Sequence, residues 1–104
     1  MTREELFELH KTTCTETLNI MKQKNQDYSG GTNDIFGNFN ACEFLGIPGE
    51  IGILVRCMDK FKRIQAFVNT GSLAVKNESV FDAINDVINY MILLKGLIVS
   101  KNEK

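Results

Sequence analysis

Apolar residues recur every three or four positions in three separate segments of the chain, as they do on a helix with one buried side. The first segment follows Thr2 and runs to about residue 24, the second spans about 50–69, and the third about 78–99. Thr2, followed three residues later by Glu5, has the spacing of a capping box at a helix start. No stretch alternates apolar and polar residues convincingly, as a strand would. The pattern therefore predicts an all-α protein, a small helical bundle with three long helices.

The segment from 25 to 40 has no helical period and is rich in Asn, Asp and Gly, which predicts a long loop in the N-terminal half of the chain. The residues that follow, NACEFLG, can form one or two helical turns that end at Gly46. The motif IPG then breaks the chain before the second long helix. We therefore expect one short helix and one long loop besides the three long helices.

The third long helix is apolar over more than half of its circumference when successive residues are placed about 100° apart. A helix with so wide an apolar surface must be covered by more than one neighbour. Two other long helices in so short a chain can hardly cover it while burying their own apolar sides. We therefore expect a homodimer or higher homo-oligomer whose helices pack across a two-fold axis. The apolar residues are Phe81, Ala83, Ile84, Val87, Ile88, Tyr90, Met91, Leu94 and Ile98.

The length of 104 residues suits a single domain, 1–104, with one core. Lys plus Arg number 12 and Asp plus Glu number 13, so the net charge of −1 provides no strong positive field for DNA or RNA. The three cysteines form no CxxC pair, which suits a reduced protein. The start of the chain does not resemble a secretory signal, and no apolar run approaches the roughly 20 residues that cross a bilayer. We expect a cytoplasmic protein with neither nucleic acid nor a membrane as its partner.

Three acids at a spacing of four, Glu78, Asp82 and Asp86, lie in the third helix. Together with Asn85 and Asn89 they fall within an arc of about 100°, so the polar residues of this helix share one strip. Like charges four residues apart weaken a helix by roughly 0.2–0.5 kcal/mol per pair. The strip is either a solvated face, as most charged strips are, or a functional surface on which something offsets the repulsion.

Three observations favour the functional surface. No Lys or Arg falls between residues 78 and 94, whereas solvated faces usually mix charges. The uncharged polar residues of the strip are asparagines, which are poor helix formers but good hydrogen-bonding groups. The second helix also carries a matching strip at helical spacing, which consists of Arg56, Asp59, Lys60 and Arg63.

Two such strips on facing antiparallel helices would place carboxylates beside cations. One use of that arrangement is a set of interhelical ion pairs. The other is chemical, because Mg²⁺ takes oxygen ligands from carboxylates and from substrate phosphates, while Lys and Arg bind the phosphates directly. Phosphate chemistry is therefore the function that the pattern favours.

The predicted loop carries four residues, Tyr28, Phe36, Asn38 and Phe39, that suit the recognition of a base. Aromatic faces stack on bases and amides form hydrogen bonds with base edges. The alternative is that the phenylalanines anchor the loop to the core, while Asn and Gly permit its turns. Both interpretations stay open at this point.

The order of four motifs, KNQDYSGG, FGNF, MDKFKRI and ESVFDAINDVINYMILL, resembles the phage and bacterial nucleotide-modification-associated proteins. More distantly, it is similar to the all-α nucleoside triphosphate pyrophosphohydrolases of the MazG and dimeric dUTPase group. The similarity covers about residues 24–97, and DAINDVINY, which is similar to the acidic helix of the MazG group, is its strongest part. One departure is clear: the MazG group has an ExxE pair on the preceding helix, where this chain has only Glu50 and Asp59, nine residues apart.

The resemblance implies an Mg²⁺-dependent nucleoside triphosphate pyrophosphohydrolase that cleaves a modified nucleotide between its α and β phosphates. Metal binding would fall to Glu78, Asp82, Asp86 and Asp59, and the catalytic residues would be Asp82, Asp86 and Lys60. The remaining residues would bind the substrate, and these are Arg63, Arg56, Asn89, Tyr28, Phe36, Asn38 and Phe39. The protein would act in the cytoplasm of a bacterium or a phage-infected host.

Two other functions fit the same residues. The protein could hold a nucleotide or a nucleotide-derived signal without cleaving it, as the incomplete acidic set favours. It could also be a structural helical oligomer in which the acidic strip forms only salt bridges.

Overall fold

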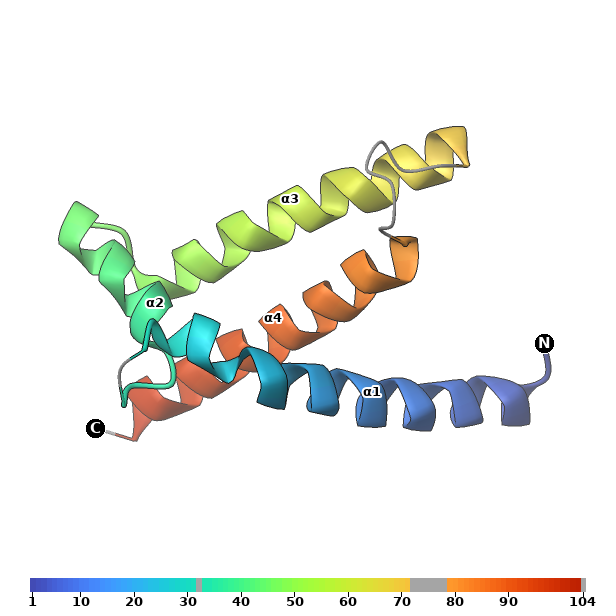
Figure 1. Cartoon of the computed structure of the whole chain (residues 1–104), viewed down its shortest axis with the longest axis horizontal. Helices are drawn as coiled ribbons and strands as arrows, with labels where there is room; N and C mark the ends of the chain where they lie inside the picture. Colours follow the sequence, from blue (N-terminus) through green and yellow to red (C-terminus); the bar gives the residue numbers. More distant parts are fainter. Residues whose placement is uncertain (32, 72–78, 104) are drawn as a thin grey trace.

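The structure is a computed structural model that describes residues 1–31, 33–71 and 79–103. Every regular element in these residues is a helix, which confirms the predicted all-α class (Figure 1). The elements in chain order are α1 (Arg3–Ser29), α2 (Gly37–Asn40), the 3₁₀ helix η1 (Ala41–Leu45), α3 (Gly49–Thr70) and α4 (Val80–Asn102).

The predicted ends of the helices agree with the structure at most positions. The Thr2 hydroxyl accepts a hydrogen bond from the Glu5 amide at 3.1 Å, as half of a capping box does. Gly46 follows η1 in the left-handed conformation, with φ of 76°, which Gly adopts without strain. The second long helix, α3, begins and ends within one residue of its prediction.

The first helix is longer than predicted, because α1 runs to Ser29 and not to residue 24. Tyr28 and Ser29 in its last turn are buried, so packing holds polar residues in a helix that their local sequence does not favour. Gly30 and Gly31, both with positive φ, then turn the chain. The predicted loop shortens to the residues between Ser29 and α2.

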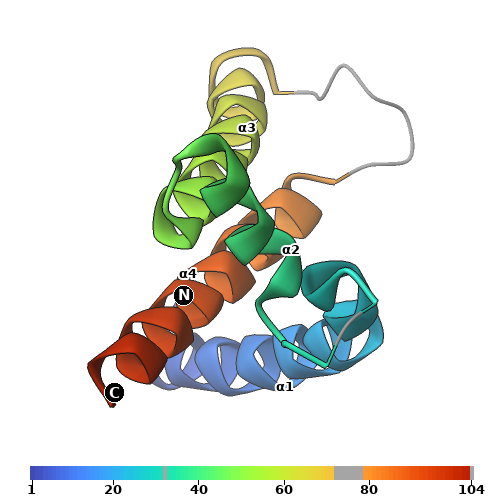
Figure 2. The same ribbon diagram turned by 90° about the vertical axis from the view of Figure 1, so that its left-hand side faces the viewer.

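The helices α3 and α4 form an antiparallel pair, and α1 crosses α4 on another side (Figures 1 and 2). The short helix α2 contacts both α1 and α3 and fills the space between them at one end of the molecule. The opposite end of α1, which carries the N-terminus, extends away from α2 and η1 (Figure 1). We call the end where α2 joins the long helices the closed end, and the end with the N-terminus of α1 the open end.

The hydrophobic core lies at the closed end, where the last turns of α1 meet α2, α3 and α4. Phe39 of α2 is 1% exposed and Ile53 of α3 is 0% exposed, so these two side chains form its centre. Phe36 packs over Gly96 of α4, where an added Cβ would lie 3.2 Å from the ring. The other buried members of the cluster are Tyr28, Cys57, Leu93 and Leu97.

Within the described residues, α4 is the one helix that is long and apolar enough to span a membrane by length and composition alone. Core helices of soluble proteins meet the same criterion, and α4 is in contact with both α1 and α3. The expectation that no membrane is a partner stays a prediction.

Candidate functional site

Three long helices meet at one carboxylate, Asp86 of α4. Its Oδ1 lies 3.3 Å from Nζ of Lys24 in α1, and its Oδ2 lies 3.1 Å from Nζ of Lys60 in α3. The side chains of Asp86 and Lys60 are each 16% exposed, whereas that of Lys24 is 45% exposed. Two cations thus share one half-buried acid, and Lys24 is the more accessible to solvent.

An aromatic cluster lies beside this group. The rings of Tyr28 and Phe39 stack with centroids 5.9 Å apart, and Tyr90 meets both rings edge-on at 6.4 and 6.5 Å. The guanidinium of Arg56, in α3, lies 5.1 Å from the centre of the Phe39 ring, which is cation–π distance. We call Lys24, Lys60, Asp86, Arg56 and these three rings the lysine–aromatic cluster.

The hydroxyl of Tyr28 holds its proton more tightly than a tyrosine in water. Burial is the main cause, and the nearby Tyr90, Asp86 and Asp27 add to it, so that the pKa of Tyr28 rises to about 12 even though Arg56 acts in the opposite direction. At neutral pH this hydroxyl is therefore a hydrogen-bond donor and not a phenolate.

Asn89 is 1% exposed and joins α4 to α1. Its Nδ2 donates a hydrogen bond to the backbone carbonyl of Thr17 at 3.0 Å. Its Oδ1 is buried and has no hydrogen-bond partner among the described residues. A buried acceptor without a partner costs free energy, so a bound water or ligand group that donates to this oxygen would be stabilised there.

Asp82, predicted as a metal ligand and catalytic residue, lies in the first turn of α4. Its carboxylate accepts a hydrogen bond from the Ser79 amide at 3.2 Å, and the Ser79 hydroxyl accepts one from the Asp82 amide at 3.2 Å. This is a reciprocal capping box with Asp at the third position of the helix. The pattern S-x-x-D in the sequence is a signal for this role that the metal interpretation overlooked.

The cap supports a direct stability prediction. We expect Ser79→Ala to lower the free energy of unfolding by about 1 kcal/mol, because the Asp82 amide loses its acceptor. The measurement is urea denaturation followed by circular dichroism. Ser100→Ala, an exposed substitution near the other end of α4, is the matched control and should change stability by less than about 0.5 kcal/mol. Equal losses in the two variants would contradict the cap.

The other predicted site residues are distributed around the cluster. Asp59 is 61% exposed and pairs with Arg63, four residues later, at 3.3 Å. Phe36 and Phe39 are buried in the core, in the anchoring role that was the alternative to base contact, and Asn38 is half-buried. Glu78 lies outside the described residues.

The described carboxylates do not converge. No group of three or more His, Cys, Asp or Glu side chains in the described ranges could hold a metal ion together. Each oxygen of the Asp86 carboxylate forms an ion pair with a lysine, and the Asp82 carboxylate caps its own helix. Glu78, the fourth predicted ligand, lies outside the described residues. The described carboxylates alone do not form the predicted Mg²⁺ site, and Mg²⁺ binding stays a prediction.

Lys24 belongs to the cluster but was not among the predicted site residues, because it lies at the predicted end of the first helix. The signal for its role is its spacing of four from Tyr28, which puts both residues on one face if the helix continues. Tyr90 was assigned only to the apolar surface of its helix. Its spacing of four from Asp86 gives the same kind of signal.

Comparisons with models of protein families, with curated proteins and with solved structures found no match to this chain.

Proposed function

We propose that this protein binds the phosphate chain of a nucleotide at the lysine–aromatic cluster. The observation that carries the proposal is the excess of positive charge, because the cluster has three cations, Lys24, Lys60 and Arg56, and the described carboxylates near its Tyr28 ring are two, Asp86 and Asp27. An excess of cations in a partly buried place attracts an anion more strongly than the same charges in water. The ligand class is thus a multiply charged anion.

The chemistry of the individual groups suits phosphate. Lys24 is the more accessible of the two lysines, and a phosphate oxygen can replace the Asp86 carboxylate as the partner of its ammonium group. Arg56 is exposed and can offer two parallel N–H donors to a phosphate. The protonated Tyr28 hydroxyl adds a neutral donor where it reaches the ligand. Asn89 and Asn38 are the amides that we assign to the rest of the nucleotide.

Hydrolysis is the second candidate function. In its favour, Asp82 and Asp86 lie one turn apart on α4 and Glu78 precedes them by the same spacing, as the resemblance to the pyrophosphohydrolases requires. A bound Mg²⁺ would polarise a phosphoryl oxygen of a nucleoside triphosphate. Lys60 and Arg63 would then stabilise the charge that develops between the α and β phosphates. This reaction requires Asp86 to leave its lysines.

The substitution Asp86→Asn separates the two functions. If the cluster only binds phosphate, the variant has two unpaired lysines and should bind ATP, dUTP and inorganic triphosphate in EDTA at least as tightly as the native protein. If Asp86 is a metal ligand, the native protein should release pyrophosphate from a panel of modified nucleoside triphosphates with Mg²⁺, and the variant should not. Calorimetry and a coupled pyrophosphatase assay measure the two outcomes.

Lys60→Ala tests whether the cluster is the binding site at all. Loss of one charge-assisted contact of about 1.5–3 kcal/mol should weaken binding by roughly 10- to 100-fold. Lys62→Ala is the matched control, since Lys62 is an exposed lysine of the same helix. It lies about 160° from Lys60 around the helix axis, so its effect should be small. Equal affinities in the two variants would refute the proposal.

We also infer that the protein is a homodimer or higher homo-oligomer and that it acts in the cytoplasm of a bacterium or phage-infected host. The wide apolar surface of α4 supports the first inference, and the resemblance supports the second.

A further inference from the structure

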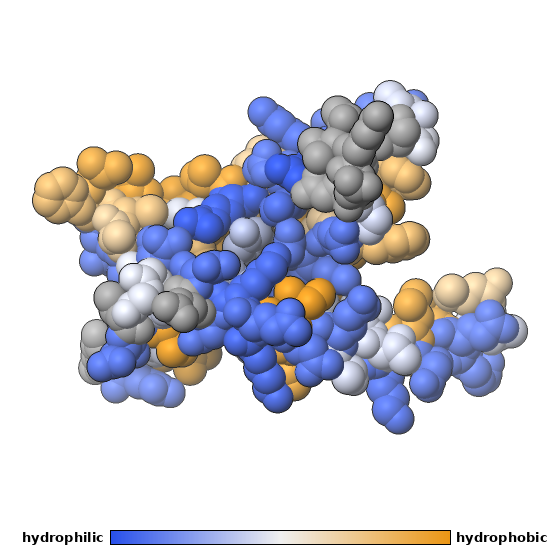
Figure 3. All heavy atoms as spheres, viewed as in Figure 1, coloured by the Kyte–Doolittle hydropathy of each residue, from blue (hydrophilic) through white to orange (hydrophobic). Residues whose placement is uncertain are grey.

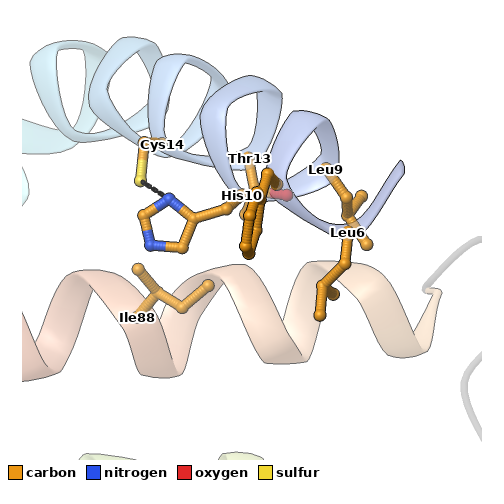
Figure 4. A pocket seen from close by; sticks show the side chains of 7 residues that line it. Leu6, Leu9, His10, Thr13, Cys14 and Ile88 are labelled. Atoms are coloured by element: carbon orange, nitrogen blue, oxygen red, sulfur yellow. Dashed lines mark hydrogen bonds between the residues drawn. The ribbon is translucent and has the colours of Figure 1, made fainter. Parts of the chain in front are cut away.

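An apolar groove opens between the first half of α1 and α4. It has a volume of about 680 Å³ and is lined by Leu6, Phe7, Leu9, His10, Thr13 and Cys14 of α1 together with Ile88 of α4. Figure 4 shows the labelled α1 side chains on the side of that helix that faces α4. Within the described residues, none of the groove-lining side chains is an acid, a lysine or an arginine. Water is therefore a poor occupant of this groove.

The walls of the groove expose large apolar side chains. Leu6 is 52% exposed and Leu9 is 49% exposed, although both lie on the side of α1 that lines the groove. On α4, Phe81 and Ile84 are exposed and lie on the same side as Ile88, at spacings of seven and four residues. Apolar residues also lie at the N-terminal end of α1 in Figure 3, away from the polar centre of that view.

The chain exposes more area than a compact monomer of its mass. A folded monomer of this mass, 11.7 kDa, exposes about 5,900 Å², whereas the chain exposes 7589 Å². The excess of about 1,700 Å² lies within the 1,000–2,500 Å² that each subunit of an obligate homodimer buries. The radius of gyration of 15.5 Å also exceeds the value of about 13 Å for a compact chain of this length.

We propose that a second copy of this chain docks in the groove, with the first half of each α1 packed into the groove of the other copy across a two-fold axis. An isologous contact of this kind uses the same surface twice, so the apolar walls of both copies are covered at once. The uncharged lining means that two copies bring no like charges together there. The proposal deepens the homo-oligomer of the proposed function by naming its surface, and it does not require a nucleotide.

The test is the mass in solution, measured by sedimentation or light scattering at 1–100 μM protein. We expect twice 11.7 kDa for the native chain. Leu9→Glu should raise the dimer dissociation constant at least roughly 30-fold, because it places a charge at the centre of the contact. Leu9 is half exposed in one chain, so the helix content in circular dichroism should not change.

Phe44→Glu is the matched control, because Phe44 of η1 is 93% exposed and lies outside the groove. It should leave the dimer intact. A native chain that is monomeric throughout this range would overturn the proposal. So would a dimer that survives Leu9→Glu, or one that only Phe44→Glu dissociates, since both results place the contact elsewhere.

Cys14 provides a second readout from inside the groove. It is exposed in one chain, whereas Cys57 is buried and serves as an internal reference. Maleimide labelling of Cys14 should become slower as the native protein is concentrated, and Leu9→Glu should remove that dependence. Fast labelling at every concentration would contradict the contact. ATP binding by the Leu9→Glu variant is tested separately, so failure of the dimer does not count against the nucleotide proposal.

Discussion

Phe39→Ala is expected to lower the free energy of unfolding by about 3–5 kcal/mol. The Phe39 side chain is 1% exposed, stacks on Tyr28 at 5.9 Å and lies under the guanidinium of Arg56. Its removal leaves a cavity where α2 joins the long helices, and the small core has few other side chains to fill it. Because domains of this kind have a total stability of about 5–15 kcal/mol, the loss is a large fraction of the whole.

The measurement is urea denaturation at one protein concentration, with Phe44→Ala as the control. Phe44 lies five residues farther along the chain and is 93% exposed, so the same substitution there should change stability by less than about 0.5 kcal/mol. Phe39→Leu should retain most of the stability, because it keeps most of the apolar volume. Similar denaturation midpoints for Phe39→Ala and Phe44→Ala would show that α2 is not part of the core.

Alkaline pH should weaken the fold through Tyr28. Its pKa rises to about 12 in the folded protein, above its ordinary value of 10.0, mainly because the ring is buried. Between these two values the unfolded chain has released the proton and the folded chain has not, so stability falls as the pH rises. Because the folded and unfolded pKa values differ by about 2, the free energy of unfolding should fall by roughly 2–3 kcal/mol between pH 10 and pH 12.

The comparison of the native protein with Tyr28→Phe isolates this effect, because every other titrating group is present in both. The native protein should lose about 2–3 kcal/mol more than the variant between pH 9.5 and pH 12, as followed by urea denaturation. The phenolate absorbance that the substitution removes should titrate near pH 12. Parallel pH profiles for the two proteins would mean that Tyr28 titrates as it does in water.

The sequence was sufficient to predict the helices because most of their signals are local. Apolar spacing located the three long helices, and Thr2 and Gly46 were correctly placed at helix ends. The last turn of α1 was missed because its local residues favour a turn. Tyr28 becomes helical through contacts with residues more than ten positions away, which no local pattern contains.

The candidate site was predicted in part. Opposite charges on α3 and α4 were expected to face each other, and Lys60 with Asp86 forms such an ion pair. The partner from α1, Lys24, could not be predicted because it depends on where α1 crosses α4. Asp82 had a local explanation in Ser79, since both the capping box and a metal site use a carboxylate in the first turn. A spacing of four between acids therefore does not separate the two roles.

The open end of α1 also affects how the chain folds. An isolated helix of fewer than about 12–15 residues is marginal in water, and most helical stability in proteins comes from packing against a neighbour. The half of α1 before Thr17 extends away from the core. The second half is held in place by three contacts: the Thr17 carbonyl accepts a hydrogen bond from Asn89 of α4, Lys24 pairs with Asp86, and Tyr28 stacks on Phe39. The two halves of one continuous helix thus differ in local stability. If two copies meet through the groove as proposed, the contact would raise the local stability of the first half of α1. Its backbone amides would then exchange their hydrogens more slowly as the protein is concentrated.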